Sequence, residues 1–223
     1  MKKFILLFMF VCIVTSMVLA QGNTYKIIGV LDEKIEDRLM LMGDSKIGLQ
    51  TLGEVDVKKG RFEFTGTVNE MIPAYIMTAD KEMLAMFMLE NAEYTLTFGR
   101  NGIEIQGGGA GQKIWVEYNN IAKKVYGKQM GIEQQFKAAY ASGNQTEMKA
   151  IQQRLEKVVA EMRKEQKQLF AKYSDSPITA FIITMEMKQM KYKELSELYN
   201  MLGDKAKESW YGQAIYKYLA QIK

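Results

Sequence analysis

The apolar residues of this chain change their period once, near residue 110. Before that point, short segments alternate apolar and polar residues, which is the period-two pattern of half-buried β-strands. After it, apolar residues return every three or four positions, as they do on one face of an α-helix. The pattern predicts an α+β chain, with an antiparallel β-domain over residues 21–109 and a helical region over residues 110–223.

The first part divides into about eight short strands, whose number and spacing are typical of a β-sandwich or barrel. We expect these strands near Tyr25–Leu31, Arg38–Met42, Gln50–Val57, Arg61–Val68, Ala74–Thr78, Ala85–Leu89, Tyr94–Phe98 and Ile103–Gln106.

Two turns set the predicted register. Gly60 can supply the positive φ of a tight loop, so Phe62, Phe64 and Val68 should share one face of the strand that follows. The dipeptide Asn101-Gly102 is the one best suited to a type I′ hairpin turn. The residues of that hairpin expected to face inward are Tyr94, Leu96, Phe98, Ile103 and Ile105.

A glycine-rich segment, Gly107-Gly108-Gly109-Ala110-Gly111, directly precedes the helical region. A phosphate-binding loop of the P-loop type needs Lys and then Ser or Thr after its last glycine, whereas Gln112-Lys113-Ile114 follows here. We therefore interpret the segment as a flexible hinge between the β-domain and the helices.

The helical region begins with two long apolar stripes at heptad-like spacing, over residues 114–139 and 148–173. Between them, Gly143 can end the first helix, while Asn144 and Glu147 can form a capping box for the second. These signals predict a long antiparallel helical hairpin. Gly127 and Gly131 each weaken the first helix by about 1 kcal/mol relative to Ala, which predicts a kink or break near Lys128.

Three shorter helices should follow the hairpin. Ser176 and Pro177 fit the N-cap and first position of one helix. Residues 194–202 are expected to form the next, and Asp204 is expected to cap a last helix that carries Trp210.

The first 20 residues have the three parts of a secretory signal peptide: Lys2 and Lys3, an apolar run, and small residues before a cleavage site after Ala20. The apolar segment of 17 residues is short for a membrane anchor. A lipoprotein would need Cys after the cleavage site, where Gln21 stands. We expect a periplasmic or secreted protein that is not lipid-anchored.

Removal of this leader changes the composition. It takes away Cys12, the single cysteine, and lowers the net charge from +4 to +2, while the chain contains no histidine. Ser-His-Asp and Cys-His sites, thiol redox pairs and conventional zinc sites are thereby excluded. The near-neutral charge argues against binding to nucleic acid or to an anionic membrane surface. No catalytic, cofactor-binding or metal-binding residue is predicted.

Two weaker chemical signals remain. Paired carboxylates support glycoside hydrolysis, and Asp32, Glu33, Glu36 and Asp37 are close in sequence, although such a charged run is typical of a solvated loop. Met-rich segments at residues 83–88 and 185–190 resemble Cu(I)-binding clusters, although Met also fills irregular gaps in cores. On a regular strand, Met86 and Met88 would share one face and Met83 would lie on the other.

Taken together, several segments resemble a domain of unknown function of exported bacterial proteins. They are YKIIGVL, GEVDVKKGRFEFTGTV, PAYIM, MFMLENAEYTLTF and IEIQGGGAGQ, followed by SPITAFII and ELSELYNML. In that family the domain commonly lies N-terminal to a thioredoxin-like, peroxiredoxin-type domain of thiol:disulfide interchange proteins. Here the sequence ends at YKYLAQIK without the Cys-x-x-Cys of a redoxin, so the resemblance transfers no activity and no catalytic residue.

Three hypotheses for function follow. The first is a non-catalytic periplasmic binding or interaction module, which would not be an enzyme. The second is the accessory half of a split thiol:disulfide system that acts with a separate redoxin as its protein partner. The third is a carboxylate-dependent hydrolase. The sequence favours the first.

Overall fold

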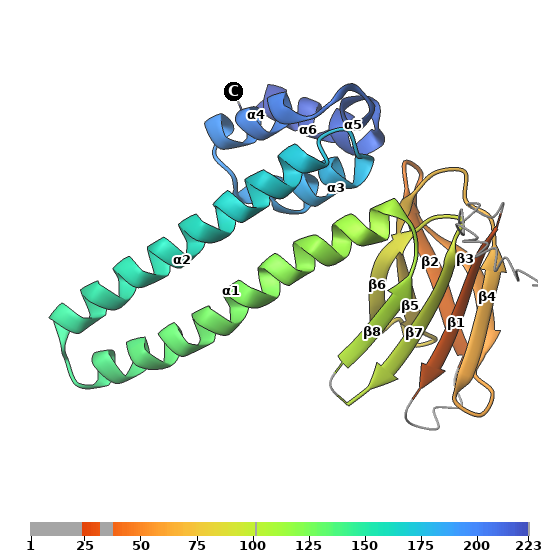
Figure 1. Cartoon of the computed structure of the whole chain (residues 1–223), viewed down its shortest axis with the longest axis horizontal. Coiled ribbons are helices and arrows are strands. Elements are labelled where there is room, and N and C mark those ends of the chain that lie inside the picture. The colour runs from red at the N-terminus through yellow and green to blue at the C-terminus, as the bar shows by residue number, and fades with distance from the viewer. Residues whose placement is uncertain (1–23, 32–37, 101, 223) are drawn as a thin grey trace, which may run out of the picture.

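The computed structural model describes residues 24–31, 38–100 and 102–222, which form a β-sandwich followed by a group of helices (Figure 1). The predicted fold class is confirmed. None of the helices in these ranges is both long enough and apolar enough to span a membrane. The proposed signal peptide and the acidic residues Asp32, Glu33, Glu36 and Asp37 lie outside the described residues.

The sandwich consists of two four-stranded sheets. The first has the order β4 (Arg61–Gly66), β1 (Tyr25–Leu31), β7 (Glu93–Gly99) and β8 (Gly102–Gly107). The second has the order β3 (Gly48–Asp56), β2 (Arg38–Ser45), β5 (Ile72–Thr78) and β6 (Met83–Leu89). Among the described strands, all pairs are antiparallel as predicted except β1 and β7, which are parallel. These two strands are far apart in sequence, and a long crossover connection permits parallel pairing.

The core of the sandwich confirms the register predicted for β4. Phe62 and Phe64 are buried and meet edge to face, with their ring centroids 5.6 Å apart. The turn before them has Gly60 at a φ of +72°, as expected. On the neighbouring strand Gly29 leaves room for the ring of Phe62, because a Cβ at that position would lie 2.0 Å from the ring.

The β7–β8 hairpin follows the prediction that five of its residues share the inward face. Tyr94 and Leu96 are buried, and Phe98 and Ile105 pack against the same core. Ile103 pairs with Phe98 and so points to the same face as predicted, although it is 38% exposed. The reason is that β8 is the last strand of its sheet, and its inner face lies at the open side of the sandwich. Asn101 lies outside the described residues.

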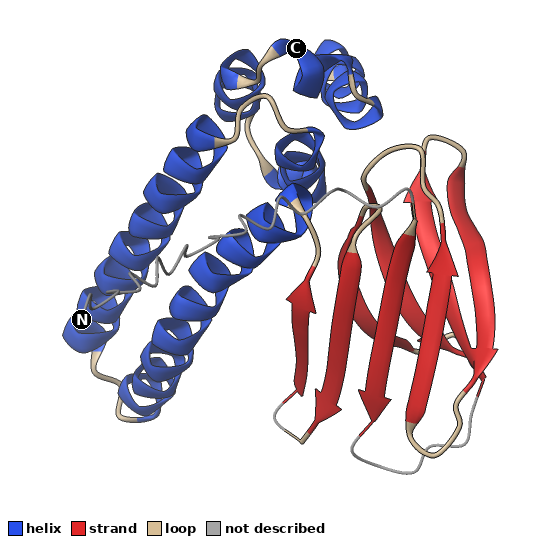
Figure 2. Ribbon diagram, turned by 45° about the vertical axis from the view of Figure 1, so that its right-hand side comes forward, coloured by secondary structure: helices blue, strands red, loops and turns tan. Residues whose placement is uncertain are grey.

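Helices α1 (Ala110–Ala141) and α2 (Gln145–Lys172) form the predicted long hairpin (Figures 1 and 2). Gly143 has a φ of +67° in the connection. The Asn144 side chain accepts a hydrogen bond from the backbone N–H of Glu147 at 3.1 Å and donates one to its carboxylate at 3.1 Å. Asn144 therefore caps α2 as predicted, but the box is not reciprocal, because the backbone N–H of Asn144 donates to the carbonyl of Ala139 and not to Glu147.

The break predicted near Lys128 is absent, because α1 is helical throughout its length. Gly127 and Gly131 both face open space. At the same level α1 is joined to α2 by Lys128, whose ammonium lies 3.2 Å from the carboxylate of Glu161. Packing of one long helix along the other outweighs the local cost of two glycines.

The remaining helices are α3 (Pro177–Glu186), the 3-10 helix η1 (Met187–Gln189), α4 (Tyr192–Met201), α5 (Asp204–Glu208) and α6 (Trp210–Gln221). Ser176 caps α3 as predicted, since its hydroxyl accepts the N–H of Ile178. The single last helix expected after Asp204 is instead two helices. Ser209 has an extended ψ of 158° and its hydroxyl accepts the N–H of Gly212, which starts α6 anew.

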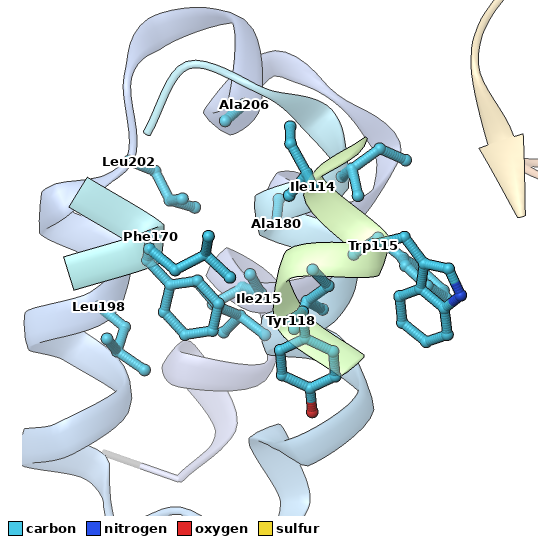
Figure 3. Close-up of a cluster of buried hydrophobic side chains, with 14 of the residues drawn as sticks. Ile114, Trp115, Tyr118, Phe170, Ala180, Leu198, Leu202, Ala206 and Ile215 are labelled. Carbon is cyan, nitrogen blue, oxygen red and sulfur yellow. The ribbon is translucent and has the colours of Figure 1, made fainter. Parts of the chain in front are cut away.

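The helices share a second hydrophobic core, which includes Ile114, Trp115, Phe170 and Ile215 (Figure 3). Met88 of β6 is fully buried in this helical core and not in the sandwich core. The helices therefore pack directly against the β6 side of the sandwich, where α1 begins.

Candidate functional site

The open side of the sandwich is bounded by β6 and β8, which are edge strands of the two sheets. Two residues separate β8 from helix α1, whose first turns lie near β6 (Figure 1). Two strand edges and the first turns of one helix thus meet at the same place.

The glycine-rich segment fixes this junction tightly. Gly107 and Gly108 have φ values of +83° and +79°, which residues other than glycine rarely adopt. A Cβ on Gly109 would lie 2.4 Å from Oε2 of Glu90, and one on Gly111 would overlap the sulfur of Met71. The interpretation as a flexible hinge is wrong, because the glycines allow close packing and a left-handed turn.

The same contacts explain the N-terminus of α1. Oε1 of the buried Glu90 accepts a hydrogen bond from the backbone N–H of Gly111 at 3.1 Å. A helix N-terminus favours an anion, and here the protein supplies its own carboxylate. The Glu90 carboxylate therefore occupies the position at the start of α1 where a P-loop would bind a phosphate.

Two further side chains, from α1 and β7, form hydrogen bonds with the backbone at the end of β6. Gln112 is 2% exposed, and its side-chain carbonyl accepts the backbone N–H of Met88 at 2.9 Å. The Tyr94 hydroxyl donates to the carbonyl of Met88 at 3.0 Å and accepts the N–H of Glu90 at 2.9 Å. Burial of this hydroxyl raises the pKa of Tyr94. The outer edge of β6 is thus partly covered by α1.

Between β6, β8 and α1 lies a groove of about 380 Å³. Its apolar lining includes exposed side chains from all three elements: Met83 at 57%, Ile103 at 38% and Val116 at 40%. The full lining is Met83, Leu84, Ala85, Met86, Ile103, Glu104, Ile105, Gln112, Trp115, Val116, Asn119, Asn120 and Lys123. We call this the edge groove.

Trp115 forms the part of the groove wall that also belongs to the helical core. Its ring stacks on Tyr118 at 5.7 Å between centroids, and Figure 3 shows the indole pointing away from Phe170 at the margin of the cluster. The Tyr118 hydroxyl in turn donates to the carboxylate of Glu186 at 2.5 Å. Burial and this hydrogen bond raise the pKa of Tyr118. The position of Trp115 in the groove wall is therefore supported by its stacking on Tyr118 and by the hydrogen bond from Tyr118 to Glu186.

This arrangement can supply apolar contacts from Ile103, Val116 and Met83, amide groups from Asn119 and Asn120, and the backbone edge of β8. In the described parts of the chain, no group of three or more His, Cys, Asp or Glu side chains is placed to hold a metal ion. The sequence reasoning did not identify the edge groove. The available signal was that Trp115 and Val116 are apolar but lie beside the helical stripe of Ile114 and Tyr118.

Each of the two Met-rich segments contains methionines that pack against the helical core and a methionine that is exposed. In the segment 185–190, Met187 and Met190 pack against the helical core, whereas Met185 is 48% exposed. In the other segment, a register shift in the β5–β6 pair places Met83 opposite Met77. The prediction that Met83 lies on the face opposite to Met86 is wrong, because one extra residue in β6 reverses the alternation.

Residues 25–129 match the family model described as Domain of unknown function (DUF4369). The resemblance to a domain of unknown function is thereby confirmed for this segment, which covers the sandwich and the first part of α1. Beyond it, the described residues are helical and contain no evident redoxin domain. No curated protein matches the sequence.

Proposed function

We propose that this chain is a non-catalytic interaction module of an exported protein, and that the edge groove binds an extended, apolar segment of a partner protein. The observation that carries the proposal is the groove itself, where exposed Ile103, Val116 and Met83 adjoin the edge of β8 with which no other described strand pairs. An extended peptide can add to such an edge through main-chain hydrogen bonds while its alternate side chains enter an apolar groove.

The groove has the properties that this mode of binding requires. Its volume of about 380 Å³ is within the range of about 300–1,000 Å³ for ligand sites, which is enough for two or three apolar side chains. Its wall is supported by buried Trp115, so a partner would meet a preformed surface. Exposed apolar side chains gathered in one place are typical of interaction sites.

Photo-cross-linking in the exporting cell tests this proposal. A photoreactive phenylalanine analogue would replace Val116 or Ile103, with Tyr126 as the matched control because it is 66% exposed and lies farther along α1. We expect one discrete protein adduct from the two groove positions and none from position 126. Ile103→Glu should abolish the adduct formed at position 116. Equal labelling at all three positions would contradict the proposal.

The same experiment addresses the partner and the compartment. A redoxin in the adduct would support the split thiol:disulfide hypothesis, in which this chain is the accessory half. Export predicts that the purified product begins at Gln21, or at its cyclised form, when its N-terminus is analysed by mass spectrometry. Retention of residues 1–20 would contradict a periplasmic or secreted location.

A further inference from the structure

The outer face of the second sheet carries an unusual concentration of methionine. The exposed face of an antiparallel sheet is ordinarily polar, with apolar residues on the alternate positions that face the core. On β2 the outward positions adjacent to the buried Leu39 and Leu41 are Met40 and Met42. On β5 the residue after the buried Ile76 is Met77.

Strand register places three of these methionines in one row. Met40 of β2 pairs with Met77 of β5, and Met77 pairs with Met83 of β6. Directly opposite residues have Cβ atoms about 4.5–5.5 Å apart, and Met is long and flexible. The three thioethers can therefore converge above β5. We call Met40, Met77 and Met83 the methionine row.

The row depends on the irregularity in β6. Without the register shift between Ile76 and Met77, residue 84 and not residue 83 would stand opposite Met77. The extra residue thus brings Met83 onto the outer face, where it is 57% exposed.

Other nearby methionines have different surroundings. Met86 packs against the helical core, and the sulfur of Met42 accepts a hydrogen bond from the Thr51 hydroxyl at 3.3 Å. Among the described residues, neither hydrophobic core includes Met40, Met77 or Met83. At the end of the row, Glu54 pairs with Met40 across the strands, and its carboxylate lies 3.6 Å from the guanidinium of Arg38. Met83 is exposed, where it also lines the edge groove, and Met40 and Met77 are half-buried outside both cores.

We propose that the methionine row binds a soft monovalent metal ion, with Cu(I) as the chemical match. Thioether sulfur is a soft donor that selects Cu(I) over harder divalent cations. Three thioethers converging above β5 would offer the ion a neutral set of three sulfur donors. Because a thioether carries no proton to lose, binding should not weaken at mildly acidic pH, unlike binding by His or carboxylate ligands.

The test is titration of the purified protein with Ag(I), and with Cu(I) under anaerobic conditions against a chromophoric chelator. Every sample carries Cys12→Ser, so that a thiol at that position cannot contribute. We expect one equivalent to bind, with similar affinity at pH 5.5 and pH 7.5. The ε-methyl NMR signals of three methionines should shift together, and Met40→Leu, Met77→Leu and Met83→Leu should each remove one of them.

Leucine preserves the apolar volume of each side chain, so the variants test the sulfur atoms. Each single variant should bind Ag(I) at least tenfold more weakly, and the triple variant should lose the site. Met185→Leu is the control, because this methionine is exposed and lies on α3. No binding by the parent protein, or undiminished binding by the triple variant with an unchanged circular dichroism spectrum, would overturn the proposal.

Discussion

The carboxylate of Glu90 accepts a hydrogen bond from the backbone N–H of Gly111 at 3.1 Å, and so links the end of β6 to the first turn of α1. The first N–H groups of a helix have no partner within the helix, and a carboxylate there also interacts favourably with the helix dipole. Since Glu90 is buried, this link is shielded from water.

Glu90→Ala should lower the free energy of unfolding by about 1–3 kcal/mol, because it leaves the buried backbone N–H of Gly111 without its acceptor. Glu90→Gln keeps a carbonyl acceptor and loses only the charge, so it should cost about 0.3–1 kcal/mol. Urea denaturation of the two variants and the parent protein measures both effects. Equal losses for Ala and Gln would show that the hydrogen bond contributes little.

The contact between Glu90 and Gly109 adds a coupled test. Gly109→Ala places a Cβ 2.4 Å from Oε2 of Glu90 and should be destabilising on its own. The double variant Glu90→Ala/Gly109→Ala has no such overlap. Its loss of unfolding free energy should therefore be smaller than the sum of the losses of the two single variants. Strictly additive losses would contradict the close contact.

Phe62 and Phe64 should be essential to the sandwich. Each Phe→Ala change should cost about 3–5 kcal/mol, through lost burial and the cavity left behind. Glu63→Ala is the matched control, because Glu63 lies between them on the outer face and forms an exposed ion pair with Lys26. That change should cost well under 1 kcal/mol. Near-normal urea midpoints for both Phe variants would contradict their place in the core.

Signals carried by neighbouring residues predicted much of this fold. Alternation of apolar and polar residues located every strand that the structure describes, and the N-cap at Asn144 located the start of α2. Ser176 and Pro177 did the same for α3. Each of these features depends on backbone preference or on side chains within a few positions, which is the information that one sequence contains.

Features that depend on distant contacts were not predictable in the same way. The break expected near Lys128 is absent where α1 packs against α2. The segment at residues 107–111, expected to be a flexible hinge, packs closely against Glu90, which directly follows β6. Exposure of Ile103 follows from its place on an edge strand. The edge groove combines side chains from β6, β8 and α1, so it exists only once the tertiary arrangement is known.

Two buried tyrosines should make the protein sensitive to alkaline pH. Burial is the main cause that raises the pKa of both Tyr94 and Tyr118, and the hydrogen bond to Glu186 adds to it for Tyr118. The folded state therefore keeps both phenol protons above the pKa of about 10 expected in the unfolded chain. Below that pH both states are protonated, so these groups give no pH dependence.

Above pH 10 the unfolded chain releases protons that the folded protein retains, so the free energy of unfolding should fall as pH rises. The slope is at most about 1.4 kcal/mol per pH unit for each tyrosine. Tyr118→Phe should cost about 0.5–1.5 kcal/mol at pH 7 through loss of the bond to Glu186, but its slope above pH 10 should be shallower. Ile183→Val, a buried change of similar cost, keeps both phenols and should retain the full slope. Urea melts at pH 8, 10 and 11 compare the three proteins, and parallel pH profiles for Tyr118→Phe and Ile183→Val would contradict a titrating role for Tyr118.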